Sequence, residues 1–227
     1  ASTPVEITVE LADDQESTGD SIGMTTGTVT LSAAPIADGS ITLTFGDGSS
    51  QTIDLVAGKT EYAFDYVHGN TEDVYLDAEG MSVTASLNGG GFADTATASD
   101  SASVADTIDT TTASVALVQN ADGNVDVVLT LSSAPQSGTS ATVTYEVNGQ
   151  SYTHTFTDGA TSWTHSNAVT VDADAYGTAT SVSAKVTGFE GGNYEDRAFS
   201  TAEVEGSYVV ASTPVEITVE LADDQES

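Results

Sequence analysis

Short runs of alternating apolar and polar residues follow one another along the whole chain, separated by glycine, proline, asparagine and aspartate. The runs at 7–11 (ITVEL) and 27–31 (GTVTL) are typical. A period of two residues indicates a half-buried β-strand, and no helical period of 3.6 residues persists over ten residues. The pattern predicts strands at about residues 5–11, 26–32, 40–45, 51–56, 61–66, 81–87 and 92–99, and again at about 113–118, 125–132, 140–147, 151–157, 161–165, 180–187 and 195–203.

Each set of seven strands has the length and the turn signals of an immunoglobulin-like (Ig-like) sandwich. Gly46-Asp47-Gly48 and Asn148-Gly149 stand between the third and fourth strands, and Asn-Gly is a strong hairpin signal. Seven short antiparallel strands in about 100 residues are typical of that fold. The chain has no cysteine, so the core disulfide of true Ig domains is excluded. The predicted fold class is all-β, with two tandem Ig-like antiparallel β-sandwich domains whose loops and linkers are calcium-bound, as argued below.

Two internal repeats define the predicted domains. Residues 1–17 recur unchanged as 211–227, a period of 210 residues (211 − 1), which indicates a tandem array or a duplicated end. Within that period LSAAP at 31–35 matches LSSAP at 131–135, an offset of 100 residues. We therefore expect one domain over 1–107, a second over 108–210, and the first strand of a further repeat over 211–227.

The charge balance excludes several classes of partner. The chain holds 35 acidic and 3 basic residues in 227, a formal net charge of −32. Nucleic acids and anionic lipid surfaces both require cationic side chains, so we expect no nucleic-acid partner and no direct membrane contact in this segment. No apolar run reaches the roughly 18 residues of a membrane span. If the parent protein is exported, its signal lies elsewhere.

The carboxylates cluster in loops that the predicted topology brings together. In an up-and-down order of seven strands, the first, third and fifth connections lie at one end, where the chain also leaves the seventh strand. Residues 13–20 and 72–77 should therefore converge on the linker that carries Asp106 and Asp109.

Converging carboxylates require a cation. Two of them about 4 Å apart repel by roughly 4 kcal/mol at an effective dielectric constant near 20. Ca²⁺ accepts 6–8 oxygen ligands in flexible geometry, Mg²⁺ demands a strict octahedron, and softer metals prefer Cys and His. The alternative is an acidic surface that serves only solubility or adaptation to salt. The candidate Ca²⁺ ligands are Asp13, Asp14, Asp20, Glu72, Asp73, Asp77, Asp106, Asp109, Asp122, Asp126, Asp172, Asp174, Asn193 and Glu195.

Three segments resemble those of a known family. Residues 104–112 (VADTIDTTT) resemble the linkers between extender domains of the giant RTX adhesins of Gram-negative bacteria, and 72–77 (EDVYLD) and 191–196 (GGNYED) are similar to loops of the same domains. In that family tandem Ig-like repeats bind Ca²⁺ in loops and junctions and form a stiff stalk that projects a terminal ligand-binding region. The resemblance implies Asp106 and Asp109 at a junction and Glu72, Asp73 and Asp77 in a loop site.

The second half departs from this pattern. Residues 172–176 (DADAY) replace the EDVY run, and residues 204–213 lack both linker aspartates. This second junction therefore binds Ca²⁺ through Glu205 and Glu216 or does not bind it. Residues 122–126 (DGNVD) resemble part of an EF-hand loop without its terminal glutamate, which is a weak signal.

The leading hypothesis is a structural spacer of a secreted, outer-membrane-anchored adhesin at the cell surface. Its partners are the neighbouring repeats of the same chain, and the fragment itself is expected to be monomeric. The alternative is a module that binds carbohydrate, peptide or ice, with contact area from Tyr62, Tyr66, Tyr75, Tyr145 and Tyr152. An enzyme is not expected, because none of the three histidines stands in a motif with a nucleophile.

Overall fold

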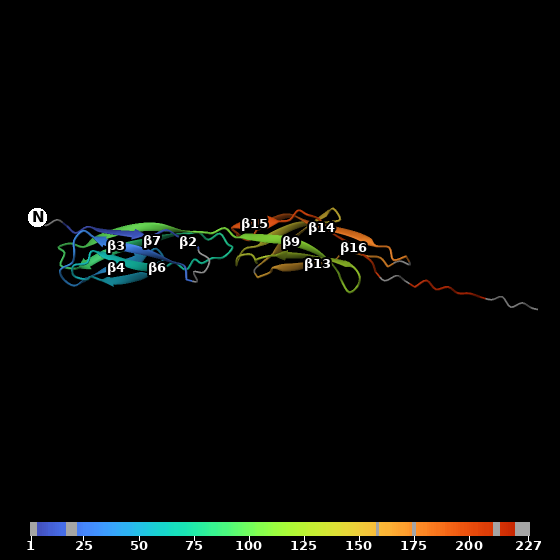
Figure 1. Cartoon of the computed structure of the whole chain (residues 1–227), viewed down its shortest axis with the longest axis horizontal. Coiled ribbons are helices and arrows are strands. Elements are labelled where there is room, and N and C mark those ends of the chain that lie inside the picture. The colour runs from blue at the N-terminus through green and yellow to red at the C-terminus, as the bar shows by residue number, and fades with distance from the viewer. Residues whose placement is uncertain (1–3, 17–21, 158, 174–175, 211–213, 221–227) are drawn as a thin grey trace, which may run out of the picture. The chain divides into compact units, whose positions relative to one another are not determined.

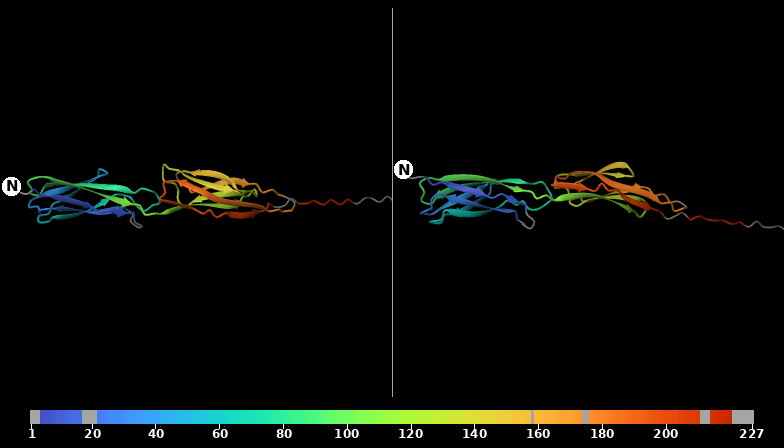
Figure 2. Two further views of the ribbon diagram at one scale, coloured as in Figure 1. Left: turned by 90° about the horizontal axis from the view of Figure 1, so that it is seen from above. Right: turned by 45° about the horizontal axis from the view of Figure 1, so that its top comes forward.

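The chain folds into β-strands arranged in two compact units. The computed structural model describes residues 4–16, 22–157, 159–173, 176–210 and 214–220, and within these ranges it contains strands and no helix. The units are Ala1–Asp109 and Thr110–Ser227. Figures 1 and 2 show the strands of each unit in two layers.

The first unit is built from a three-stranded and a five-stranded sheet, in the orders β1-β3-β6 and β2-β8-β7-β4-β5. β1 pairs antiparallel with β3, with Thr8 opposite Thr30, and β4 pairs antiparallel with β5, with Thr42 opposite Thr52. The strands are β1 (Ile7–Leu11), β2 (Asp14–Gln15), β3 (Met24–Leu31), β4 (Gly39–Phe45), β5 (Ser50–Asp54), β6 (Glu61–Val67), β7 (Glu79–Gly89) and β8 (Ala96–Ala105).

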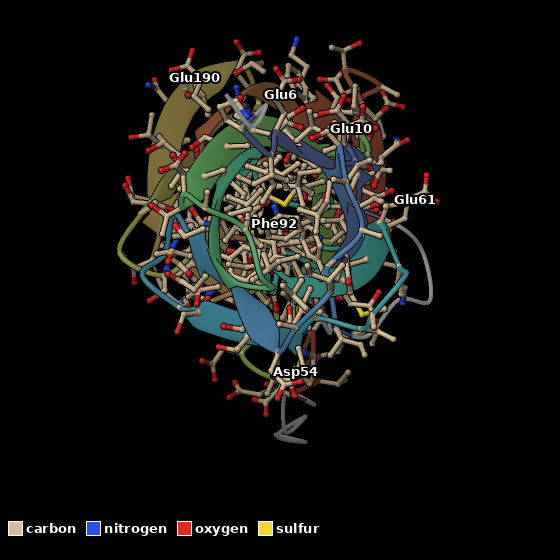
Figure 3. The ribbon with its side chains drawn as sticks, turned by 90° about the vertical axis from the view of Figure 1, so that its left-hand side faces the viewer. Glu6, Glu10, Asp54, Glu61, Phe92 and Glu190 are labelled. Carbon is tan, nitrogen blue, oxygen red and sulfur yellow. The ribbon has the colours of Figure 1, made fainter. Side chains whose placement is uncertain are left out.

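Alternate residues of these strands form the core between the two sheets. Burial in β1 and β6 follows the period of two that the sequence predicts, with Ile7, Val9 and Leu11 inside and Thr8 and Glu10 outside. Figure 3 shows this end-on: carbon-rich side chains fill the centre, and Glu6, Glu10, Asp54 and Glu61 lie at the rim. The hydrophobic effect therefore holds the two layers together and leaves the acids in solvent.

The first strand changes sheets part-way. β1 pairs antiparallel with β3, and after two residues the chain continues as β2, which pairs parallel with β8 through Asp14–Val104 and Gln15–Ala105. The Glu16 N–H then donates to the Ala105 carbonyl at 3.0 Å. This crossing brings an acidic stretch against the last strand of the unit.

The second unit has two four-stranded sheets, in the orders β13-β10-β9-β15 and β12-β11-β14-β16. Here the first strand stays in one sheet and the last one divides: β15 pairs parallel with β9, and β16 pairs antiparallel with β14. The strands are β9 (Thr110–Gln119), β10 (Val125–Leu131), β11 (Ala141–Val147), β12 (Gln150–Phe156), β13 (Ser162–Val169), β14 (Thr180–Gly191), β15 (Asp196–Phe199) and β16 (Val204–Tyr208).

Both units are Ig-like β-sandwiches, which confirms the all-β sandwich part of the predicted fold class, and the calcium-bound loops and linkers stay a prediction. Two of the predicted strands differ most from the structure. Residues 195–203 are not one strand, because the chain leaves the first sheet after Phe199 and joins the other at Val204. The strand predicted over 92–99 spans 96–105 instead, since Gly89, Gly90 and Gly91 all have positive φ and extend the preceding turn.

Candidate metal centre

Carboxylates from three separate stretches meet at one end of the first unit. One ligand oxygen each of Glu16, Asp73 and Asp77 lies within 4.8 Å of the others, and a Glu16 oxygen also lies within 4.8 Å of one from Asp106. Glu16 follows β2, Asp73 and Asp77 lie between β6 and β7, and Asp106 follows β8. The structure thus brings together the connections that the strand-order argument assigned to one end.

The short strand β2 determines where Glu16 points. Residues two apart in a strand face the same side, so Asp14 and Glu16 both face inward while Gln15 is exposed. The Glu16 side chain is only 2% exposed. Glu16 lies in the acidic run 13–20 but is not among the ligands predicted from the sequence, because a two-residue strand leaves no readable alternation.

A close backbone approach shapes the loop that carries Asp73 and Asp77. The Gly23 carbonyl accepts hydrogen bonds from the N–H groups of His68 and Gly69, at 3.0 and 3.2 Å. Gly23 has φ +54°, and a Cβ atom added there would lie 2.1 Å from the Asn70 carbonyl oxygen. Only glycine fits this contact, which sets the start of the loop.

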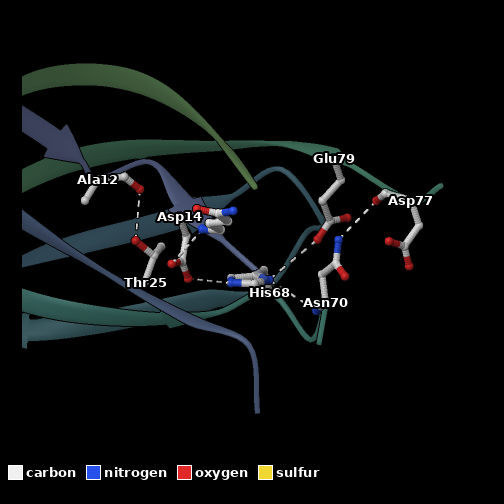
Figure 4. A network of polar contacts seen from close by, with 8 residues as sticks. Ala12, Asp14, Thr25, His68, Asn70, Asp77 and Glu79 are labelled. Atoms are coloured by element: carbon white, nitrogen blue, oxygen red, sulfur yellow. Dashed lines mark hydrogen bonds and ion pairs between the residues drawn. The ribbon is translucent and has the colours of Figure 1, made fainter. Parts of the chain in front are cut away.

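Side chains fix the rest of the loop. The Asp73 carboxylate accepts the Tyr75 N–H at 2.6 Å, a local turn that aspartate favours. The Asn70 side-chain amide donates to the Asp77 carbonyl at 3.1 Å. These bonds hold the backbone on both sides of the carboxylates, as Figure 4 shows for Asn70 and Asp77.

A buried histidine supports the same loop. Asn70 N–H donates to His68 Nδ1 at 3.1 Å, so the ring proton lies on Nε2, which donates to the Asp14 carboxylate at 3.1 Å. The His68 side chain is 2% exposed, and Glu79 lies 3.9 Å from its Nδ1. Asp14 therefore anchors the loop through His68 (Figure 4).

The residues that follow β8 also bond to the loop between β6 and β7. Thr107 Oγ1 donates to Glu72 Oε1 at 2.7 Å. Burial raises the pKa of the Asp106 carboxyl, and the negative charges of Asp77 and Asp73 raise it further, against hydrogen bonds from the backbone N–H groups of Asp77 and Ala78. The charge of Asp106, in the segment that follows β8, therefore depends on the carboxylates of the loop between β6 and β7.

Several oxygens at this end are buried without a donor. Within the described part of the chain, Glu72 Oε2, Asp77 Oδ1, Asp106 Oδ1 and Asn70 Oδ1 accept no hydrogen bond. A buried acceptor without a partner costs about 1–3 kcal/mol, and more if it is charged. A bound cation would satisfy these oxygens.

No lysine or arginine supplies that cation among the described residues. Lys59 lies 5.0 Å from the ring centre of Tyr62, Lys185 pairs with Glu146 at 3.1 Å, and Arg197 donates to a backbone carbonyl. The donors at this end are carboxylate and amide oxygens, which suit Ca²⁺. The residues present therefore fit a calcium ion, with Glu16, Asp73, Asp77 and Asp106 as the side chains that would hold it.

The other candidates of the first unit have different surroundings. Asp13 accepts the N–H and the hydroxyl of Ser103 at 2.9 and 3.2 Å, which joins the β1–β2 crossing to β8. Asp109 is exposed and lies outside the groups described above. Asp20 lies outside the described residues.

In the second unit the partial EF-hand pattern forms a hairpin turn. The Asn120 side-chain oxygen accepts the N–H groups of Asp122 and Asn124, at 3.0 and 3.1 Å. Asp126 accepts the Asn120 side-chain amide at 2.7 Å and the Asn167 N–H at 2.8 Å. Protein donors thus already occupy Asp126 Oδ1, an oxygen of one of the two candidate ligands in this turn.

The remaining candidates lie apart within the second unit. Asp172 is exposed on the segment between β13 and β14, and Asp174 lies outside the described residues. Asn193 and Glu195 belong to the turn before β15, where the Asn193 amide donates to Gln136 at 2.7 Å. Among the described residues of this unit, no three carboxylate or histidine groups of its own come within 4.8 Å.

Three of the five tyrosines considered for ligand contact are core residues. Tyr62, Tyr145 and Tyr66 are 2%, 1% and 8% exposed, and burial raises the pKa of Tyr145 to about 12. Tyr75 and Tyr152 are partly buried. The structure therefore gives the tyrosines mainly a packing role.

A row of half-buried aromatic rings follows the seam between β12 and β13. The His154 ring stacks on Trp163 at a centroid distance of 4.0 Å, and Tyr145 Oη lies 2.8 Å from His165 Nδ1. Burial lowers the pKa of His154. These rings join the edge strands β12 and β13 of the two sheets.

Of the comparisons with known proteins, only the one with solved structures finds similar chains. No protein-family model matches the chain, and a search of curated proteins finds no match. A structure titled as a tetra-tandem repeat in the extending region of a large adhesion protein is 19% identical, with a TM-score of 0.36, over 92% of this chain and 49% of that one. The chain thus spans about half the length of that structure. A segment of two fibronectin type-III domains from chicken tenascin is 12% identical, with a TM-score of 0.27, over 89% of this chain and 97% of that segment.

None of the described segments forms a helix with the length and apolar character needed to cross a bilayer.

Proposed function

We propose that this chain is a calcium-dependent structural spacer, an extender segment of a repeat adhesin at a bacterial cell surface. The observation that carries the proposal is the cluster of Glu16, Asp73, Asp77 and Asp106. Three carboxylate oxygens of this end, on Glu72, Asp77 and Asp106, are buried and without donors. Asp106 belongs to the segment that leaves the first unit, so an ion bound here joins that segment to the body of the domain.

The unchanged recurrence of residues 1–17 supports a repeated role. Identical domains in a row lengthen the protein, whereas they add little to its selectivity for a ligand. A β-strand of eight residues spans about 26 Å, so stacked sandwiches project far from their point of attachment. In this proposal the parent protein is secreted and anchored in the outer membrane, and the neighbouring repeats of the same chain are its partners.

Calcium supplies the switch between a stiff and a slack array. Extracellular modules bind Ca²⁺ with dissociation constants of about 10⁻⁴–10⁻³ M. At such affinities the site fills in calcium-rich water outside the cell and empties in the cytosol. The ion would hold residues 105–109 against the loop between β6 and β7 and lower the repulsion among the acids.

Small-angle X-ray scattering tests the spacer role. Transfer from 10 mM CaCl₂ to EDTA is expected to broaden the pair-distance distribution, because the exit segment loses its attachment to the loop. MgCl₂ and NaCl at the same ionic strength are the controls, since general screening would act through them equally. Superimposable curves in calcium and EDTA would contradict the proposal.

A further inference from the structure

One buried ring connects two of the three stretches that carry the acidic cluster. His68 follows β6 directly and begins the loop that carries Asp73 and Asp77. Its Nε2 donates to Asp14 Oδ2 at 3.1 Å, and Asp14 lies in β2, two residues before Glu16. The ring therefore joins the start of the loop to β2, as Figure 4 shows for His68 and Asp14.

The other ring nitrogen continues the connection into the loop. The Asn70 N–H donates to His68 Nδ1 at 3.1 Å, and the Asn70 side-chain amide donates to the Asp77 carbonyl at 3.1 Å. Three hydrogen bonds in series thus lead from Asp14 to the backbone of Asp77. A displacement of the His68 ring would therefore move a segment that carries acidic ligands on each side of it.

Backbone bonds hold each of the two stretches separately. β2 pairs with β8 through Asp14–Val104 and Gln15–Ala105, whereas the loop begins against the Gly23 carbonyl. These bonds do not run from one stretch to the other. A calcium ion requires its oxygen ligands at 2.3–2.6 Å, so its affinity depends on the contacts that hold the two stretches in one arrangement.

Histidine meets a requirement at position 68 that the side-chain amides do not. The δ position accepts a hydrogen bond and the ε position donates one. The His68 side chain is 2% exposed, so water does not reach it to replace either bond. Asparagine has polar atoms at the δ position alone, and glutamine has them at the ε position alone. Each amide therefore keeps one of the two bonds and loses the other.

We propose that His68 is a positioning residue of the calcium site, which sets the affinity for Ca²⁺ by holding Glu16 and Asp77 in one arrangement. The inference rests on the proposed calcium site and adds a residue that acts on the ion through other residues. Replacing an outer residue that orients metal ligands typically lowers metal affinity by about 10–100-fold. Loss of either His68 bond is expected to have an effect of that size.

Calcium titrations of H68Q and H68N test this role. H68Q keeps a donor for Asp14, and H68N keeps an acceptor for the Asn70 N–H. The dissociation constant is read from the backbone NMR signals of Asp73 and Asp77, so calcium bound elsewhere on the chain does not enter the measurement. Each variant is expected to raise the dissociation constant by about tenfold or more.

His165 provides the matched control. It belongs to the second unit, where its Nδ1 lies 2.8 Å from Tyr145 Oη. H165Q makes the same exchange of histidine for glutamine and also disturbs a histidine hydrogen bond. The calcium dissociation constant read at the first unit is expected to stay within about twofold in H165Q.

A double-mutant cycle tests the bond to Asp14. The Asp14 carboxylate accepts the Gln15 N–H and the His68 Nε2–H on different oxygens, and the single oxygen of an asparagine side chain cannot do both. D14N is therefore expected to weaken calcium binding severalfold further in H68Q, which still donates to Asp14, and by less than about twofold in H68N, which does not. The lost charge acts in both backgrounds and cancels in the comparison. Equal effects in the two backgrounds would overturn the linkage.

The failure of His68 as a positioning residue differs from the failure of the calcium site. If the signals of Asp73 and Asp77 in the parent do not respond to calcium, the site itself is disproved, and the role of His68 with it. If the parent binds calcium and both H68Q and H68N bind it within about twofold as well, the site stands and His68 is merely structural, even where the melting temperature in EDTA falls.

D14N in the parent gives the same test without a change to the buried ring. The Asp14 side chain is 30% exposed, so this variant leaves the core intact even if the His68 variants do not fold. D54N makes the same change in charge at an exposed position. D14N is expected to raise the dissociation constant about tenfold more than D54N, and equal values for the two would contradict the proposal.

Discussion

Replacing Asp77 with asparagine is expected to change the melting temperature (Tm) of the first unit in opposite directions with and without calcium. Glu16, Asp73 and Asp77 lie within 4.8 Å of one another. At that distance each pair of charges repels by about 3.5 kcal/mol for an effective dielectric constant of 20. In EDTA the loss of one charge should therefore raise Tm, by roughly 4–8 °C for each kcal/mol of relief.

In calcium the same substitution should lower Tm. A concentration of 10 mM is about 10–100 times the expected dissociation constant, which stabilises the folded parent by about 1.4–2.7 kcal/mol. The parent is therefore expected to gain roughly 6–20 °C from calcium. D77N weakens the site and loses most of that gain. Differential scanning calorimetry in both buffers measures the reversal.

Asp54 provides the matched control for D77N. It is exposed at the end of β5 and lies at the rim in Figure 3. D54N makes the same change in net charge, so general repulsion affects both variants alike. A calcium response in D77N equal to that of D54N would show that Asp77 does not bind the ion.

Truncation of a central core side chain is expected to destabilise one unit by about 2–5 kcal/mol. Leu43 on β4 and Leu129 on β10 are both 0% exposed, one in each unit. Because each unit has its own buried core, L43A should lower the melting transition of the first unit, and L129A that of the second. The expected loss is a large share of the roughly 5–15 kcal/mol that stabilises a domain.

Calorimetry of the two core variants assigns the transitions. Once they are assigned, calcium is expected to raise the transition that L43A lowers by more than the one that L129A lowers, since the acidic cluster belongs to the first unit. A single transition that both variants shift equally would contradict independent units.

The alternation of apolar and polar residues predicts most of the strands, though not β2 or the division of residues 195–203 between two sheets. In β1, β6 and β10 burial follows the period of two closely, because one face of each strand meets the core. Strand order then fixed which connections share an end, and the structure brings Asp73, Asp77 and Asp106 together as that order requires.

Short elements and local turns limited the prediction of the site. Glu16 owes its position to the two-residue strand β2, which no periodicity reveals. Asp126 sits in an acidic run that looks like a metal loop, but it accepts hydrogen bonds from Asn120 and Asn167. Acid content alone does not distinguish these roles, because what differs is whether protein donors already satisfy the oxygens.

The most direct test is a diffraction map of the chain crystallised in millimolar CaCl₂, with anomalous differences collected at long wavelength. We expect an anomalous peak at 2.3–2.6 Å from carboxylate oxygens of Glu16, Asp73, Asp77 or Asp106, the usual calcium–oxygen distance. A well-ordered map in which only water lies among these carboxylates would contradict a calcium site at this end of the first unit.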